Sequence, residues 1–309
     1  MTVFKDLIKL MKDLQYYKKA KKADTHNHLN LSMSYYRYKK WAGFSIPHFP
    51  RKLNGLGEMH EIISEYTRPR CKTKDDVVQL IEMSIKSAIS DNIVLLEGSI
   101  DINFIRHFNE DMDDFLLAVD TVVKKHKEKI EVVPELGVPK TLDRDFLKKW
   151  VIPLISSGVF KNIDLYGPEV SEGIEDFVYI FEAAGKYGLK KKAHVGEFSN
   201  AMSVKKFVEC FSLDEVQHGI GAASDDSVLQ FLKDKKIRCN VCPASNVGLG
   251  AVKSLKEHPI AKMMRAGVTV SLGTDDLMFF GKTNSVQLYE LVKENVITEE
   301  EADRLINIR

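Results

Sequence analysis

The sequence of 309 residues is poor in cysteine and contains no long apolar run. Its four cysteines, at positions 71, 210, 239 and 242, are too sparse for a disulfide framework. No stretch approaches the roughly 20 apolar residues that a membrane-spanning helix needs. The N-terminal stretch MTVFKDLIKLMKDL mixes Lys and Asp with its apolar residues, which favours an amphipathic helix over a secretory signal. These absences predict a cytoplasmic protein.

The sequence also lacks a strong overall charge, since its formal net charge is +1. With 44% hydrophobic and 29% charged residues, it has the composition of a globular protein with a large core. The charge is nevertheless uneven: residues 1–74 carry +10 and the remainder −9. Solvated helix faces account for most such runs, and attraction of an anionic ligand is the functional alternative. No RNA- or DNA-binding module is apparent, so a nucleic-acid partner is not expected.

Segments typical of strands and of helices alternate along the chain. Helical spacing occupies residues 75–89, 113–126, 144–155, 173–188, 204–211, 225–234 and 251–267. The eight predicted strands are residues 22–29, 92–101, 129–139, 159–167, 189–197, 214–220, 236–243 and 268–276. This alternation predicts an α/β protein, a closed TIM (β/α)₈ barrel of parallel strands. An open doubly wound sheet is the alternative, but no Gly-rich phosphate loop follows the first strand.

The connection after the first predicted strand is unusually long. Residues 30–72 mix aromatic residues, basic residues and turn formers. A long excursion after a barrel strand is expected to cover the site as a substrate lid. No internal repeat or Pro-rich linker divides the chain. Residues 1–309 are therefore predicted to form one domain, with a helical lid after the first strand and an extra N-terminal helix.

Polar side chains gather at the C-terminal ends of the predicted strands. His26 and His28 lie two residues apart on extended backbone, so their imidazoles face the same side. His194, His218 and an Asp-Asp doublet at 275–276 end three further strands. Each alone has an ordinary structural explanation, as a hydrogen-bonded histidine or a helix cap. Because the C-terminal strand ends line the active site of a barrel, the set predicts a shared site.

Histidines together with a carboxylate suit a catalytic zinc site. One zinc ion per chain, with one position left for water, would generate hydroxide near neutral pH. His218 is placed to orient the hydroxide and accept its proton, and Glu197 to supply an acid to the substrate. The predicted zinc ligands are His26, His28, His194 and Asp275.

Six segments carry a resemblance to a known family: DTHNHL, DLYGPE, AHVGE, VQHG, CPASNVGLG and SLGTDD. In this order, between residues 24 and 276, the sequence resembles the adenosine deaminase family within the amidohydrolase group. The resemblance implies hydrolytic deamination of a small 6-aminopurine nucleoside or nucleotide. The products would be the inosine compound and ammonia, formed by attack of metal-bound hydroxide at C6.

The resemblance also implies roles for individual residues. Glu197 would protonate the ring nitrogen beside the attacked carbon, while His218 and Asp275 would orient the hydroxide. Asp276 would bond the imidazole-side nitrogen of the purine, and the backbone of Gly167 would approach the base. Supporting roles would fall to Asp164, which would hold its loop, and to Cys242, Pro243, Ser245 and Asn246.

Two positions depart from the usual family pattern. Gly273 precedes T-D-D where the family usually has Asn or Ser. Asn30 stands where adenosine deaminases typically place an aspartate that reaches the ribose. An aspartate there would repel a 5′-phosphate, whereas an asparagine would not. Met33 lies at the spacing found in AMP deaminases. Adenosine, AMP and their deoxy forms therefore all stay open as substrates.

A basic run follows Asn30 and bears on the same question. AMP deaminases place basic residues in this region, so Asn30 and the run are expected to contact the substrate, the run on its phosphate side. The run consists of Arg37, Lys39 and Lys40.

Other functions fit the sequence less well. Deaminases of cytosine and nucleic-acid bases use H-x-E with P-C-x-x-C, and neither spacing occurs here. The lone C-x-x-C at 239–242 lies in an apolar strand and is expected to be core packing. A related amidohydrolase acting on another amino-heterocycle is the enzymatic alternative, although residues 162–169 offer no lysine to bridge two metals. A non-catalytic purine-binding barrel is the other alternative.

Overall fold

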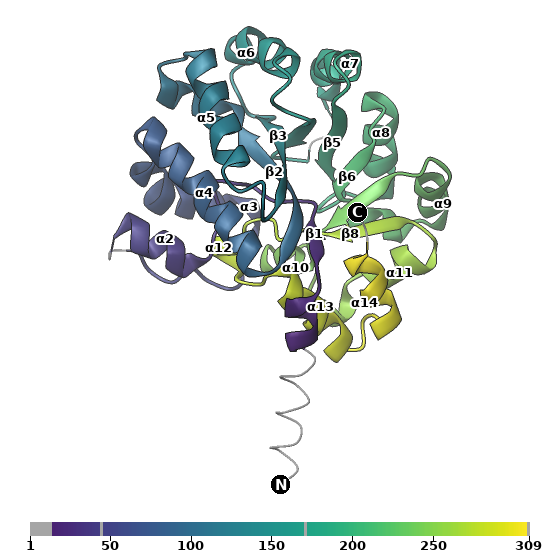
Figure 1. The fold of residues 1–309 in the computed structure, drawn as a ribbon. Coiled ribbons are helices and arrows are strands. Elements are labelled where there is room, and N and C mark those ends of the chain that lie inside the picture. The colour runs from purple at the N-terminus through teal and green to yellow at the C-terminus, as the bar shows by residue number, and fades with distance from the viewer. Residues whose placement is uncertain (1–13, 44–45, 170–171, 308–309) are drawn as a thin grey trace.

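The computed structural model describes residues 14–43, 46–169 and 172–307, and at its centre lies a barrel of eight parallel strands (Figure 1). Neighbours in the barrel are neighbours in the chain. The strands are β1 (Lys22–Asp24), β2 (Ile93–Asp101), β3 (Glu131–Pro139), β4 (Asn162–Tyr166), β5 (Lys190–Val195), β6 (Glu215–His218), β7 (Arg238–Val241) and β8 (Thr269–Leu272). Each lies inside its predicted range, so the predicted α/β barrel of eight parallel strands is confirmed.

The first and last strands lie side by side, which nearly closes the barrel. The Thr25 N–H donates to the Leu272 carbonyl at 3.2 Å, and the Asp275 N–H donates to the His26 carbonyl at 2.9 Å. These bonds run just past the end of β1 and along the end of β8. They therefore hold two of the predicted site segments against each other.

Helices cover the outside of the barrel (Figure 1). Their inner faces carry apolar residues at helical spacing. In α5 (Met112–Lys124), for example, Phe115, Val119 and Val122 are buried. The helices between strands are α4 (Lys74–Ser90), α5 (Met112–Lys124), α6 (Arg144–Ser156), α7 (Val178–Lys186), α8 (Ala201–Phe211), α9 (Asp226–Asp234), α10 (Pro243–Gly248) and α11 (Ile260–Arg265). After β8 come α12 (Leu277–Phe280), α13 (Asn284–Lys293) and α14 (Glu299–Ile306).

Most predicted helices are present with small shifts of their ends, and one differs. The single helix expected over 251–267 is a 3₁₀ turn, η6 (Leu255–Glu257), followed by α11. Pro259 separates the two, because a proline ring inside a helix removes a backbone hydrogen bond and clashes with the preceding turn. Further 3₁₀ turns are η3 (Ile102–Phe108), η4 (Ile174–Phe177) and η5 (Ile220–Ser224).

The connection between β1 and α4, residues 30–72, is mostly helical. It contains α2 (Tyr35–Ala42), α3 (Gly55–Ile62), a π-helical turn η1 (Ile63–Thr67) and a 3₁₀ turn η2 (Arg68–Arg70). This β1–α4 segment has an apolar cluster of its own, which includes Tyr38 and Met59 and packs on Leu80, Met278 and Phe279. It is thereby seated against α4 and the chain after β8.

At the other end of the chain, residues 14–19 are helical, whereas the N-terminal helix expected over residues 1–14 lies almost entirely outside the described residues. Among the helices that can be described, none is long and apolar enough to cross a membrane.

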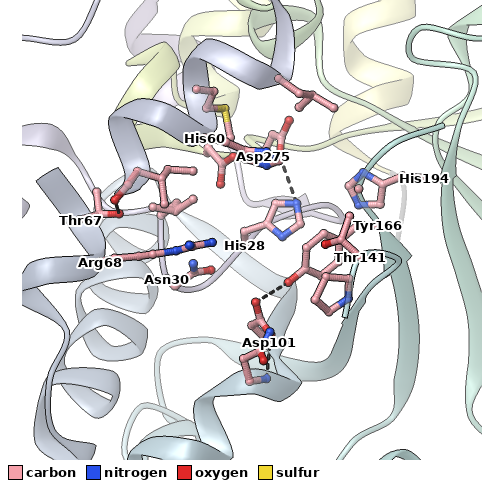
Figure 2. Close-up of a pocket in the computed structure, with 18 of the residues that line it drawn as sticks. His28, Asn30, His60, Thr67, Arg68, Asp101, Thr141, Tyr166, His194 and Asp275 are labelled. Atoms are coloured by element: carbon pink, nitrogen blue, oxygen red, sulfur yellow. Dashed lines mark hydrogen bonds and ion pairs between the residues drawn. The ribbon is translucent and has the colours of Figure 1, made fainter. Parts of the chain in front are cut away.

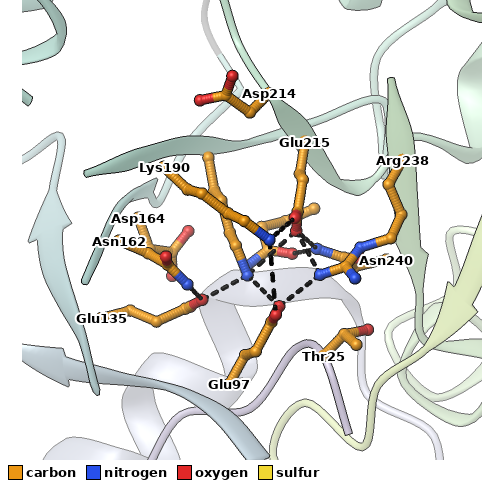
Figure 3. A network of polar contacts seen from close by, with 12 residues as sticks. Thr25, Glu97, Glu135, Asn162, Asp164, Lys190, Asp214, Glu215, Arg238 and Asn240 are labelled. Atoms are coloured by element: carbon orange, nitrogen blue, oxygen red, sulfur yellow. Dashed lines mark hydrogen bonds and ion pairs between the residues drawn. The ribbon is translucent and has the colours of Figure 1, made fainter. Parts of the chain in front are cut away.

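The barrel interior beneath the predicted site is filled by charged residues (Figure 3). The fully buried Lys192 Nζ lies 2.5 Å from both Glu97 and Glu135 and 3.2 Å from Glu215. Arg238 donates to Glu97 at 2.5 Å and to Glu215 at 2.7 Å. Three carboxylates thus share two well-buried cations. Burial accordingly raises the pKa of Glu135 to about 7, despite the neighbouring Lys192.

Candidate metal centre and active site

The predicted histidines converge at the C-terminal mouth of the barrel. The ring centroid of His26 lies 5.2 Å from that of His28, 4.6 Å from that of His194 and 4.9 Å from that of His218. Asp275 Oδ1 lies 3.5 Å from His26 Nε2 and 3.4 Å from His28 Nε2. Residues in β5 and β6 and just after β1 and β8 therefore meet, as predicted from their places at the strand ends.

Strained backbone positions two of these side chains. His218 has a φ of 64° and Asp275 a φ of 54°, in the left-handed region that non-glycine residues rarely adopt. Such conformations cost on the order of 1–3 kcal/mol and persist where the surroundings hold them. Ser245 donates to Asp275 Oδ2 at 2.5 Å, and the Ser32 hydroxyl donates to the Asp275 carbonyl. Asp275 is thus fixed from both neighbouring loops.

The cluster has the donor atoms and the unmet hydrogen-bonding capacity of a metal site. The buried Nε2 atoms of His26 and His194 have no hydrogen-bond partner, which is costly unless something else binds them. Three groups of side chains each place their donor atoms within 4.8 Å of one another. They are His26, His28 and His194; His26, His218, Cys242 and Asp275; and His28, Asp275 and Asp276. This nitrogen, oxygen and sulfur set fits zinc.

The C-x-x-C pair is fully buried, and Cys239 packs in the core. Cys242 lies closer to the site than expected, since it joins one of the possible ligand groups.

Asn246 organises the acid and the base. Its Nδ2 donates to Glu197 Oε1 at 3.0 Å and lies 3.1 Å from His218 Nδ1, while its Oδ1 lies 3.2 Å from His258 Nε2. The Nε2 of His218 then faces Glu197 Oε2 at 3.6 Å and Asp275 Oδ2 at 4.0 Å. His258 is part of this arrangement, and no sequence motif had indicated it.

Burial sets the protonation states of these groups. Burial, with the charges of Asp275 and Glu169, raises the pKa of Glu197 well above its ordinary value. Burial, with the neighbouring His26, lowers the pKa of His218 to about 4. Burial therefore favours the protonated acid at Glu197 beside a neutral imidazole at His218, which suits one group to donate a proton and the other to accept one.

Glu169, after β4, holds the loop that carries Glu197. Its carboxylate accepts hydrogen bonds from the backbone N–H groups of residues 196, 197, 198 and 199, at 3.0, 2.7, 3.2 and 2.8 Å. Four donors converge on one side chain, so the loop after β5 is anchored to the segment after β4. No role was predicted for Glu169 from the sequence, although it ends the motif DLYGPE.

Above the cluster opens a cavity of about 780 Å³ (Figure 2). Its inner wall includes His28, His194, Glu197, His218 and Asp275, together with Gly167 and Asp276. Burial, with the charge of Asp275, raises the pKa of Asp276 to about 8, and its Oδ1 has no hydrogen-bond partner. A protonated Asp276 can thus offer a hydrogen bond to a molecule in the cavity.

Two further residues lie beside the histidines of the cluster. The Tyr166 hydroxyl donates to Asp101 Oδ2 at 2.7 Å, and its ring lies 5.2 Å from that of His28. Tyr166 therefore forms a fixed wall, which was not predicted from the sequence. Asp164 is fully buried beneath the cavity, and its Oδ1 lies 3.3 Å from His194 Nε2. It contacts a predicted ligand, whereas a role in holding its own loop was expected.

The predicted substrate-side residues divide into two groups. Asn30 lines the cavity. The basic run of α2, residues 37–40, does not: Arg37 donates to Ser90 Oγ at 2.9 Å, and Lys39 lies 5.8 Å from the centroid of the Tyr35 ring. Lys40 is exposed and likewise lies outside the lining. The β1–α4 segment contributes other polar side chains instead, among them Arg68.

Gly273, the second departure from the family pattern, lies against His26. A Cβ atom at this position would lie 2.5 Å from His26 Cβ and 2.9 Å from Cys242 Sγ. The absence of a side chain therefore lets the end of β8 approach the first strand closely.

Comparison with known proteins agrees with this geometry. The family model described as adenosine deaminase matches residues 65–307. A Treponema pallidum (strain Nichols) protein, provisionally named adenosine/adenine deaminase, is 60% identical over 299 residues, which cover 97% of this chain and all of that protein.

Solved structures share the fold at low sequence identity. Adenine deaminase from Arthrobacter aurescens has a TM-score of 0.82 at 20% identity and covers 93% of this chain and 91% of its own. An amidohydrolase from Burkholderia ambifaria with bound Zn has a TM-score of 0.79 at 18% identity, over 95% and 85% of the two chains. Arabidopsis ADAL complexed with GMP has a TM-score of 0.75 at 19% identity, over 94% and 91%. By its sequence, the chain belongs to the adenosine deaminase family of the amidohydrolase superfamily.

Proposed function

We propose that the protein is a zinc-dependent hydrolase that releases ammonia from the 6-amino group of a purine. The observation that carries the proposal is the placement of Glu197 Oε2 3.6 Å from His218 Nε2, with Asp275 Oδ2 4.0 Å from the same nitrogen, in the wall of one cavity. Hydrolytic deamination needs a group that accepts a proton from water and a group that donates one to the ring. This pair supplies both.

Four side chains are proposed to hold the zinc ion: His26, His28, His194 and Asp275. The orphaned Nε2 atoms of His26 and His194 support this choice. When bound, zinc lowers the pKa of a water ligand to near 7 and so supplies a nucleophile at neutral pH. Asp164 Oδ1 lies 3.3 Å from this same Nε2 of His194, so its carboxylate would border the bound ion.

The remaining residues act on the substrate. Glu197 would donate its proton to the ring nitrogen beside C6, so that the carbon accepts oxygen from water. His218 would take a proton from that water and pass it to the amino group, which would leave as ammonia, while the hydroxyl proton of the C6 adduct would return to Glu197. The protonated Asp276 would donate to the imidazole-side nitrogen of the purine, and Gly167 would present its backbone to the base. Asn246, which contacts both side chains, would hold Glu197 and His218 in position relative to each other.

The substrate is proposed to be a small purine compound bound beneath the β1–α4 segment, which would act as a lid over the cavity. The 60% identical relative carries an adenosine/adenine deaminase name, and the ADAL structure holds a purine nucleotide. Both support a purine at this site. We further propose that residues 1–309 act as one domain.

The direct test is to measure zinc content and ammonia release. The purified protein, with zinc restored, should release ammonia from at least one of adenine, adenosine, deoxyadenosine, AMP and dAMP. Removal of zinc with a chelator should abolish the release, and added zinc should restore it. The proposal would be refuted if the folded, zinc-loaded protein released no ammonia from any of these five compounds.

A further inference from the structure

The cavity extends beyond the space that a purine base would occupy. Its volume of about 780 Å³ lies in the upper part of the roughly 300–1,000 Å³ range of small-molecule pockets. The reacting groups Glu197, His218 and Asp276 occupy the inner wall only. The outer wall comes from α3, η1 and η2 of the β1–α4 segment and from η3, and it includes Met59, Arg68 and Phe104. A substrate that fills the cavity therefore carries a substituent on the base.

Arg68 provides a free cation in this outer part. Figure 2 shows its side chain reaching from the β1–α4 segment toward Asn30 and His28, and all three line the cavity. In the part of the chain that the structure describes, no side chain or carbonyl accepts a hydrogen bond from the Arg68 guanidinium, and no carboxylate pairs with it. Its N–H donors are therefore available to a ligand.

The backbone before Arg68 supports a specific role. The π-helical turn η1 ends at Thr67, whose hydroxyl donates to the Ile63 carbonyl at 2.9 Å, and Pro69 lies in the following turn η2. π-helical turns are rare and occur frequently at functional sites. Here the π-helical turn η1 is followed directly by the proline-containing turn η2, which begins at Arg68, a residue of the cavity wall.

We propose that Arg68 binds an anionic group at the 5′ end of the ribose, so that the preferred substrate is a 6-aminopurine nucleoside 5′-phosphate or 5′-carboxylate. This inference rests on the proposed deaminase function. The planar guanidinium matches phosphate and carboxylate oxygens with two parallel hydrogen bonds. Asn30 adds no negative charge that would oppose the anion. Adenine has no group to reach Arg68, and adenosine brings no charge to it.

Kinetics with four substrates test the inference. The zinc-loaded wild type, Arg68→Gln and the control Arg51→Gln are compared on AMP, adenosine 5′-carboxylate, adenosine and adenine. Arg51 is an exposed cation of the same segment that does not line the cavity. We expect kcat/KM of the wild type to be higher for an anionic substrate than for adenosine. Arg68→Gln should reduce that preference roughly 10- to 100-fold, the worth of a charged hydrogen bond, and Arg51→Gln should not.

Comparison of AMP with adenosine 5′-carboxylate shows whether the site prefers a phosphate or a carboxylate, since the preferred anion gives the higher kcat/KM. A wild type that prefers adenosine or adenine overturns the inference while leaving the deaminase function intact. The inference is also overturned if Arg68→Gln lowers kcat/KM by the same factor on all four substrates.

Binding of reaction products gives a readout that does not depend on turnover. By calorimetry, IMP should bind the wild type more tightly than inosine, and Arg68→Gln should remove most of the difference. If no substrate releases ammonia but this Arg68-dependent preference for IMP is found, the deaminase proposal fails and the anion site stands. Equal affinities for IMP and inosine in the wild type, with AMP no better than adenosine, refute the site.

Discussion

The Glu169 carboxylate accepts a hydrogen bond from the backbone N–H of Glu197 at 2.7 Å and three more from residues 196, 198 and 199. Glu169 and the proposed proton donor come from loops after different strands. The position of Glu197 above the barrel therefore depends on a side chain that contributes no proton to the proposed reaction. Charge-assisted bonds of this kind are about twice as strong as neutral ones.

Replacing Glu169 with Gln should lower kcat roughly 10- to 100-fold while the protein stays folded and keeps its zinc. The amide has one acceptor oxygen and a nitrogen that repels the backbone N–H groups, so the loop shifts. A displacement of about 1 Å at a reacting group can cost about 100-fold. Steady-state kinetics, circular dichroism and zinc analysis together measure the effect. Glu172→Gln, an exposed change in the same loop, is the control; equal kcat values for the two variants would contradict the positioning role.

Glu197→Gln should remove most of the activity without removing the metal. Glutamine preserves the bond from Asn246 Nδ2 but cannot donate a proton as a carboxylic acid does. General acid–base catalysis is typically worth 10²- to 10⁴-fold, so a loss of about that size in kcat is expected. The assay is ammonia release at saturating substrate with matched zinc content. Activity within a few fold of wild type would mean that another group supplies the proton.

His26→Ala should instead reduce zinc occupancy. His26 is fully buried at the centre of the histidine cluster, and its removal leaves too few ligands for tight binding. Zinc per chain after dialysis, measured by atomic emission, should fall well below one, and the loss should be partly reversed at high added zinc. His107→Ala changes a cavity histidine outside the cluster and should leave occupancy unchanged. Full zinc occupancy in His26→Ala would show that the metal does not need this ligand.

The sequence predicted the barrel and the convergence of its histidines because both follow from local patterns. Strand ends of a parallel barrel meet at one rim, so strand positions alone bring His26, His194 and Asp275 together. The β1–α4 segment could not be predicted in the same way. The basic run of α2 was the predicted contact, yet Arg37 donates to Ser90, and it is Arg68, in the turn η2, that lines the cavity. Which face of an irregular insertion meets the cavity depends on tertiary packing, which sequence periodicity does not record.

Gly273→Ser should destabilise this protein. The added Cβ would lie 2.5 Å from His26 Cβ, so the first strand end must move. Overpacking of this kind costs typically about 1–3 kcal/mol, and here it also disturbs a proposed zinc ligand. Urea unfolding and zinc content should both show the loss. Gly185→Ser, at a helical glycine with open space around it, is the matched control. If the two variants have the same free energy of unfolding, the end of β8 shifts to accommodate the added side chain at no cost in stability.

The three buried carboxylates beneath the site should make stability depend on pH. Glu135 has its pKa raised by burial to about 7, above its ordinary value near 4.5, so folding favours its protonated form. The stability that it contributes is complete below pH 4.5 and is lost as the pH rises through 7. Glu135→Gln removes this titration and keeps an oxygen for Lys192 and Asn162.

The variant should therefore gain stability relative to wild type between pH 5 and pH 8, by on the order of 1–3 kcal/mol. Urea unfolding of the metal-free proteins at both pH values measures the change. Glu215 acts in the opposite sense, because Lys192 and Arg238 hold its pKa low against burial, and its contribution is lost only as the pH falls. Glu128→Gln, at an exposed position, should show no pH-dependent difference from wild type. If Glu135→Gln also shows no pH-dependent difference in stability from wild type, Glu135 is ionised over the whole range from pH 5 to pH 8. The exposed Lys190 or water must then balance the negative charge of the third carboxylate.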